Sequence, residues 1–277
     1  MKKSHYLSTG LVAATAVLSS MNALADTAAN IYNTYSSGQP TTYDNASGAY
    51  PVVTAIGSQP GTSDGYTYSS YSFLAQDSTG SMDLYGTLSG LGYTPTVGDA
   101  ITATGTYSPY HQISELATIT SITATSQGNP VPAPVAYTIP TLLASGTGLL
   151  PENLSGYLVE LDNVSLYVNS AATTPVSGNF ATHANTTLYA KDGSGNIIET
   201  YVWASSYSVD GALGGTAIPT GTVDMTGFVS QSSTFPPEFT PFSITEVQVP
   251  EPSVLNLCGV GGVGSLLAFI SRFRKKA

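Results

Sequence analysis

The chain has a single cysteine, Cys258, and it lies in an apolar stretch near the C-terminus. An intramolecular disulfide cannot form, so the fold depends on its hydrophobic core, which a chain of this length can supply. Thiol catalysis and cysteine-ligated metal sites are therefore excluded for the segment that precedes Pro250.

Basic residues are almost as scarce, and they lie at the two ends. Six of the seven Lys and Arg residues are Lys2, Lys3, Arg272, Arg274, Lys275 and Lys276. Residues 26–250 hold one, Lys191, against 16 acidic residues (the chain's 17 without Glu251), which is a net charge of −15. Lys and Arg bind phosphate backbones and anionic lipid surfaces, so this composition opposes binding to nucleic acid or to such surfaces.

The first 25 residues have the pattern of a secretory signal peptide. Lys2 and Lys3 precede an apolar run over residues 11–18, and Ala23 and Ala25 form a small-residue cleavage site. This order predicts export across the inner membrane, with residues 1–25 removed.

The C-terminus predicts a single transmembrane helix. Residues 254–270 carry no charge, and as a helix they reach about 25 Å, slightly less than the roughly 30 Å hydrocarbon core. The basic tail 271–277 stays on the cytoplasmic side by the positive-inside rule and stops translocation through Arg272, Arg274, Lys275 and Lys276. The alternative is an amphipathic helix packed on the domain, which is disfavoured because the run is apolar or small on every face.

Residues 249–277 resemble the PEP-CTERM sorting signal of Gram-negative bacteria that make extracellular polysaccharide. Pro250, Glu251 and Pro252 match the motif, and the glycine-bearing apolar run and basic tail follow in the family's order and spacing. The resemblance implies processing by an exosortase near these three residues and delivery to the cell surface or extracellular matrix. It implies nothing about what the preceding body does.

The body itself predicts an all-β fold. Residues 26–49 are rich in Ser, Thr, Asn, Gly and Tyr without a helical period, which predicts a polar linker. From Tyr50 onward, short runs of strand-forming residues alternate with Gly, Asn, Asp and Pro. This sequence pattern is typical of short strands joined by turns.

The body also repeats itself in three blocks. Residues 73–85 (FLAQDSTGSMDLY) align without a gap with 188–200 (LYAKDGSGNIIET), and each stretch predicts a β-hairpin. Two further pairs follow in the same order: 99–107 with 221–229, and Glu115-Leu116 with Glu238-Phe239. We therefore predict two copies of one module, over 50–125 and 154–248. The proline-containing linker 126–153 joins them, with a short helix near 141–144.

The strand order expected within each copy resembles that of an OB-fold, a small Greek-key barrel. The stretches FLAQDSTGSMDLYG, VGDAITATGTY and ISELATITSI resemble the OB-fold modules attached to some secreted bacterial nucleases and other surface proteins. The resemblance implies two tandem OB-fold-like barrels. In those nucleases a separate domain performs the chemistry, and we expect no such domain in this chain.

Two acidic turns are candidate calcium loops. They are residues 77–80, with Asp83 nearby, and residues 192–196, with Glu199 nearby. Calcium takes about six to eight oxygen ligands, which neither stretch supplies, whereas Asp followed by Gly suits a hairpin turn. We predict turns, and no metal or cofactor.

Catalytic motifs are missing from the body. His111 and His183 have no second ligand at zinc spacing, and no G-x-S-x-G or S-x-x-K motif occurs. A paired-carboxylate glycosidase site built on Glu115 or Glu238 is the alternative. We predict a protein that is not an enzyme.

Aromatic residues gather around the hairpins and are candidates for ligand stacking: Tyr66, Tyr68, Tyr71, Tyr85 and Tyr107 in the first copy, with Tyr201 and Trp203 in the second. OB-fold strand faces bind oligosaccharides as well as oligonucleotides, and sugars stack on rings without needing cations. The alternative is that these residues only cover half-buried strands.

The combined prediction is an exported, non-catalytic binding or adhesion protein of the cell surface or extracellular matrix. Its expected partners are exopolysaccharide or other surface proteins, besides the exosortase. The alternatives are a secreted hydrolase or its accessory domain, and an OB-fold nucleic-acid-binding protein, which the single Lys191 opposes.

Overall fold

The computed structural model describes ten stretches of the chain: residues 25–44, 48–58, 61–63, 66–88, 90–110, 113–143, 156–181, 185–202, 213–230 and 237–247. The predicted signal peptide up to residue 24 and the whole sorting signal 249–277 lie outside them. Among the helices of the described stretches, none is long and apolar enough to cross a membrane.

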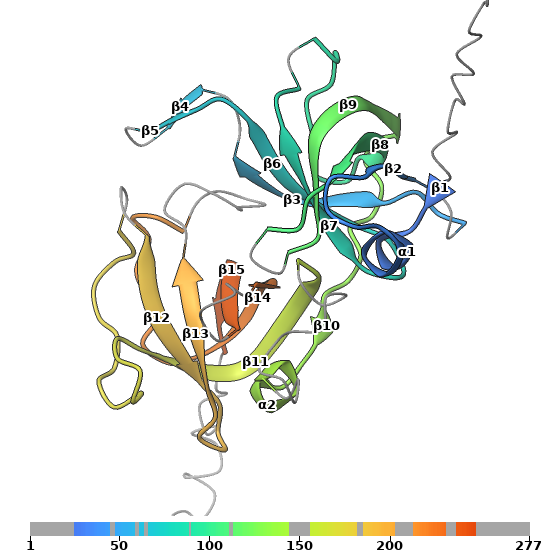
Figure 1. Cartoon of the computed structure of the whole chain (residues 1–277). Helices are drawn as coiled ribbons and strands as arrows, with labels where there is room; N and C mark the ends of the chain where they lie inside the picture. The colour runs from blue at the N-terminus through green and yellow to red at the C-terminus, as the bar shows by residue number, and fades with distance from the viewer. Residues whose placement is uncertain are drawn as a thin grey trace, which may run out of the picture.

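Five strands close into a first barrel (Figure 1): β3 (Val52–Ser58), β6 (Tyr71–Gln76), β7 (Ser81–Gly86), β8 (Ala100–Tyr107) and β9 (Glu115–Ser126). Strands β3, β6 and β7 pair antiparallel, and β7 then pairs parallel with β9. Strand β8 pairs antiparallel with both β9 and β3, which closes the barrel. Alternate residues of β8 point inward, as the period of two in its sequence requires.

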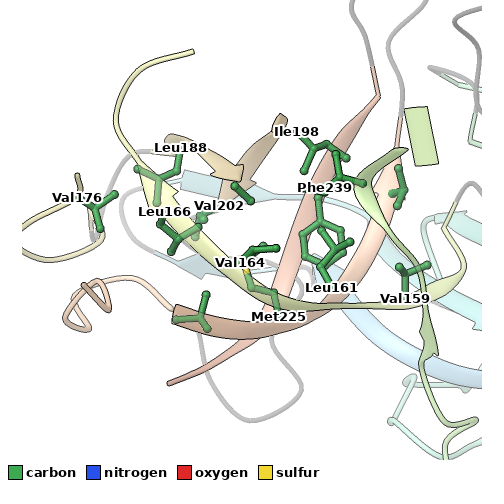
Figure 2. Packing of buried hydrophobic residues seen from close by; sticks show 14 of the residues in the cluster. Val159, Leu161, Val164, Leu166, Val176, Leu188, Ile198, Val202, Met225 and Phe239 are labelled. Carbon is green, nitrogen blue, oxygen red and sulfur yellow. The ribbon is translucent and has the colours of Figure 1, made fainter. Parts of the chain in front are cut away.

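A second barrel repeats this order of pairings with β11 (Leu158–Tyr167), β12 (Thr186–Lys191), β13 (Ile197–Val202), β14 (Thr222–Ser230) and β15 (Glu238–Glu246). Its core is built from inward-facing residues of all five strands, among them Leu161, Leu188, Ile198, Met225 and Phe239 (Figure 2). The prediction of an all-β chain with two five-stranded, OB-fold-like barrels is confirmed.

Equivalent glycines mark the fourth strand of each barrel. The pairing register shifts next to Gly105 in β8 and next to Gly227 in β14. A Cβ on Gly105 would lie 2.6 Å from the carbonyl oxygen of Ala117, and one on Gly227 would overlap the carbonyl oxygen of Thr240. Both positions therefore need glycine, because the neighbouring strand approaches too closely for a side chain.

The two hairpins differ in length, which corrects the gap-free alignment. Residues 77–80 lie between the paired Gln76 and Ser81, whereas residues 192–196 lie between the paired Lys191 and Ile197. The second turn is one residue longer. Asp83 therefore corresponds to Glu199, and not to Ile198 as in the gap-free alignment.

The prediction of a polar linker over residues 26–49 is wrong. The segment forms β1 (Ala25–Asp26), α1 (Ala28–Thr34) and β2 (Pro40–Tyr43), and β2 extends the first sheet by pairing with β8. Ala28, Ile31 and Tyr43 are buried in the first core. A helix of two turns is too short to show a period, so the sequence pattern did not reveal it.

The segment between the barrels is also partly structured. It holds β10 (Val135–Ala136), which pairs parallel with β11, and α2 (Ile139–Leu143), whose Ile139 and Leu142 are buried in the second core. The predicted helix near 141–144 therefore begins two residues earlier. A separate hairpin, β4 (Gly61–Ser63) with β5 (Tyr66–Tyr68), projects from the first barrel (Figure 1).

The barrels pack on each other through a small apolar cluster, which we call the junction: Ala55 and Leu74 of the first barrel with Leu158, Phe228 and Phe242 of the second. The Phe228 and Phe242 rings are tilted, with centroids 5.5 Å apart. The backbone N–H of Leu158 also donates a hydrogen bond across the junction to Oε1 of Gln76, at 3.0 Å.

Candidate functional site

Each barrel carries a row of four outward-facing residues that run across its first, second, third and fifth strands. The first row is Ala55, Leu74, Asp83 and Glu115, and the second row is Tyr167, Tyr189, Glu199 and Glu238. The members face outward because their neighbours along each strand, such as Phe73 and Leu188, point into the cores. The carboxylates recur in both rows, and the other two positions have diverged.

The second row is a half-exposed aromatic surface. Tyr167 of β11 and Tyr189 of β12 are direct cross-strand partners, so their Cα atoms are about 4.5–5.5 Å apart. Both side chains are half-buried. Two adjacent rings held on a rigid sheet form a platform on which a flat ligand can stack.

Polar groups surround this platform. The Lys191 ammonium lies 5.6 Å from the centre of the Tyr167 ring, a cation–π contact. Beside the row, Nδ2 of Asn185 donates to the hydroxyl of Tyr201 at 2.8 Å. These hydroxyl, amide and ammonium groups can exchange hydrogen bonds with a polyhydroxyl ligand.

The acidic end of the second row is formed by Glu199 and Glu238, which are partners across the parallel strands β13 and β15. The hydroxyl of Ser230 donates to Oε1 of Glu238 at 3.1 Å. Two carboxylates beside one lysine make the row unsuited to polymers of phosphate or uronic acid.

The first row has a different environment, because the second barrel covers it at Ala55 and Leu74. Asp83, next to Leu74, is only 7% exposed although it points away from its own core. The hydroxyl of Ser72 donates to its two carboxylate oxygens, at 3.1 and 3.3 Å. Asp83 and Glu115 are direct partners across the parallel strands β7 and β9.

These two carboxyls have raised pKa values. Burial raises the pKa of Asp83 to about 7, and the Glu115 carboxylate adds to the shift, whereas hydrogen bonds from Ser72 and from the backbone of Phe73 oppose it. Burial likewise raises the pKa of Glu115 to about 7. The pair is therefore partly protonated near neutral pH.

Three of the predicted stacking residues of the first copy have described side chains, and these three differ in exposure. Tyr107 is 4% exposed and belongs to the first core, so its prediction as a ligand residue is wrong. Tyr71 packs partly buried against the same core, and Tyr85 is 45% exposed. Tyr66 and Tyr68 lie in β5, but the placement of their side chains is outside the description, as is all of Trp203.

Sequence reasoning missed Tyr167 and Tyr189. The signal was available in the alternation of LVELDNVSLY and TTLYAK, which places both tyrosines on the outer face. That they lie side by side depends on the register between β11 and β12, which alternation does not determine.

The two acidic turns are hairpin turns, as predicted. Oδ1 of Asp77 accepts hydrogen bonds from the backbone N–H groups of Thr79 and Gly80, and Oδ2 accepts from the N–H of Ala28. In the second turn, Oδ1 of Asp192 accepts from the N–H groups of Ser194 and Asn196. The carboxylates are thus engaged by donors, and no group of three possible metal ligands occurs within the described stretches.

Other predicted site residues lie outside the described stretches: His111, His183, Ala23, Pro250, Glu251, Pro252, Arg272, Arg274, Lys275 and Lys276. Ala25 is the first residue of β1.

Comparisons with known proteins place the chain in no family. No family model matches it, and no curated protein does. Among solved structures, a replication protein A heterotrimer bound to single-stranded DNA aligns with 87% of this chain and 71% of its own, at 10% identity and a TM-score of 0.22. A TM-score this low has no bearing on function.

Proposed function

We propose that this protein is an exported, non-catalytic binding module of the cell surface or extracellular matrix, and that its second barrel binds polysaccharide along the row from Tyr167 to Glu238. One observation carries the proposal. Of two equivalent rows, one is covered by the junction, while the other is half-exposed and holds two adjacent tyrosines.

The ligand is a polysaccharide that is neutral or carries amino groups. Sugar rings stack on tyrosine faces, and their hydroxyls bond to carboxylates and amides without needing cations. The body's net charge of −15 repels acidic polymers at low ionic strength. The same charge opposes nucleic acid, the ligand that fold analogy alone favours.

The proposal that the protein is exported and sorted is based on the sequences at the two ends of the chain. The signal-peptide pattern over 1–25 and the PEP-CTERM resemblance over 249–277 support passage across the inner membrane, transient anchoring by residues 254–270, and processing by an exosortase. A matrix rich in exopolysaccharide is the compartment that this resemblance implies, and it would contain the proposed ligand.

The experiment is a glycan array probed with the purified protein, with DNA and RNA oligomers as controls. Tyr189→Ala removes one ring of the platform and should weaken binding about tenfold. Tyr85→Ala is the matched control, because Tyr85 is exposed on the equivalent hairpin of the first barrel but lies outside both rows.

Three results would contradict the proposal. Equal losses for the two variants would move the binding surface away from the second row. Tight DNA binding at physiological salt would favour the nucleic-acid alternative. Shortening of a bound glycan during incubation would favour a hydrolase.

A further inference from the structure

A carboxyl pair with one buried member, Asp83, lies beside the junction between the barrels. Asp83 is flanked in its row by Leu74, which is in the junction, and by Glu115. An outward-facing residue of a barrel becomes buried only where something packs over that face. Over Leu74, the packing partners are the second barrel and the partly buried Ile113 and Val131.

Nothing described around the pair neutralises its charge. Strand β6 contributes the hydroxyl of Ser72 and a backbone hydrogen bond from Phe73, and β9 contributes Glu115 itself. The second barrel contributes the apolar side chains of the junction. Tyr85 follows two residues after Asp83 on the same face.

The one basic residue in the described stretches is Lys191, and it lies over Tyr167 on the second barrel. When Asp83 and Glu115 are both ionised, their carboxylates repel each other, because the two groups are partly desolvated and no cation is described beside them.

We propose that Asp83 and Glu115 make the junction sensitive to pH: the barrels stay packed together while the pair holds a proton, and their contact loosens when both carboxyls are ionised.

The direction follows from proton linkage. The raised pKa values of both groups mean that the packed state binds protons more tightly than a state in which water reaches the pair. Packing is therefore most stable in acid. It weakens as the pH rises from about 4 toward about 7, and it changes little above that range because both states are then ionised.

Glu199 and Glu238 supply the internal comparison. They form the equivalent pair in the second row, and Glu199 is half-exposed, so water screens its charge. The same two positions thus hold one buried and one half-exposed carboxyl in the first barrel, and two half-exposed carboxyls in the second.

The experiment is hydrogen exchange of the full-length purified protein between about pH 5 and about pH 8.5, corrected for the intrinsic dependence of exchange on pH. The reporter is the peptide that contains the Leu158 amide, whose acceptor is Gln76 across the junction. Peptides from β12 and β13 report whether the second barrel itself unfolds. Protection of the Leu158 peptide should fall about tenfold or more with rising pH, while protection of β12 and β13 stays constant.

Two neutral variants test the cause. Glu115→Gln, at the half-exposed member of the pair, and Asp83→Asn should each remove most of the pH dependence, and the matched control Glu199→Gln should keep it. Glu115→Gln suffices if the Asp83 variant does not fold. The proposal is overturned if wild-type protection does not change with pH, if the neutral variants retain the wild-type dependence, or if β12 and β13 lose protection together with the Leu158 peptide.

Discussion

Asp83 and Glu199 occupy the same position in the two barrels, yet Asp83 is buried beside the junction and Glu199 is half-exposed. The residues that precede them in their rows account for the difference. Leu74 packs against the second barrel, whereas Tyr189 is half-exposed among the described residues. Divergence at the positions beside a shared carboxylate has turned one face into a contact between barrels and left the other face available.

The stability of the protein should carry a component that decreases with pH. In the folded state the pKa values of Asp83 and Glu115 are about 7, against ordinary values of 3.8 and 4.5. Between these limits the folded state binds more protons than the unfolded state, so ionisation favours unfolding. The component is fully present below about pH 4 and lost by about pH 7.

Thermal unfolding across this range measures that component as the difference between wild type and Asp83→Asn. The variant should gain stability relative to wild type as the pH rises. A constant difference from about pH 4 to about pH 8 would contradict the prediction.

Gly227→Ala should destabilise the second barrel by about 1–3 kcal/mol, since the new methyl group would overlap the carbonyl oxygen of Thr240. Gly105→Ala should act in the same direction, because its Cβ would meet the carbonyl oxygen of Ala117. Gly193→Ala is the control, as nothing lies within 4 Å of its Cβ position. Denaturant midpoints measure all three, and equal midpoints for Gly227→Ala and Gly193→Ala would be inconsistent with the close strand approach.

Asp77→Ala should destabilise the first barrel and release α1. The substitution leaves the N–H groups of Ala28 and Gly80 without their acceptor, and each unsatisfied buried donor costs about 1–3 kcal/mol. Asp192→Ala is the matched control, since its turn is exposed and holds no helix. Hydrogen exchange of residues 28–34 is the measurement, and unchanged protection there would contradict the role of Asp77.

Chelation should leave the melting temperature of the wild-type protein unchanged, because the oxygens of Asp77 and Asp192 accept hydrogen bonds from backbone N–H groups. A melt in the presence and absence of EDTA and added calcium tests this. A shift that calcium reverses would restore the calcium-loop interpretation of one of the two turns.

Leu74→Ala should loosen the junction and lower stability by about 2–5 kcal/mol, the range for truncating a buried leucine. Leu74 is fully buried and packs outward against the second barrel, so the loss should separate the unfolding of the two barrels into two transitions. A single calorimetric transition with unchanged midpoint would show that the junction does not couple them.

The strands were predictable because each barrel is built from local patterns. The alternation in Ala100–Tyr107 and the repeated order of the blocks determine strand existence and barrel number. The same alternation could not say which face of β8 is the core, and Tyr107 therefore changed from predicted ligand residue to core residue. The helix α1 was missed because it is too short to show a period, and because one contact that holds it, the hydrogen bond from Ala28 to Asp77, spans 49 residues of sequence.

The candidate site was less predictable, since it depends on register and on contacts between the copies. Tyr167 and Tyr189 become neighbours only through the pairing of β11 with β12. The burial of Asp83 depends on packing between two barrels that are far apart in sequence. No local pattern encodes either relationship.

Polysaccharide binding by the second row is tested by the affinity of Tyr189→Ala for the strongest glycan identified on the array. Wild type and Tyr85→Ala are measured for comparison. Isothermal titration should give a dissociation constant for Tyr189→Ala about tenfold weaker than for wild type, with Tyr85→Ala unchanged. Wild-type affinity in Tyr189→Ala, with the fold intact, would contradict polysaccharide binding by the second row.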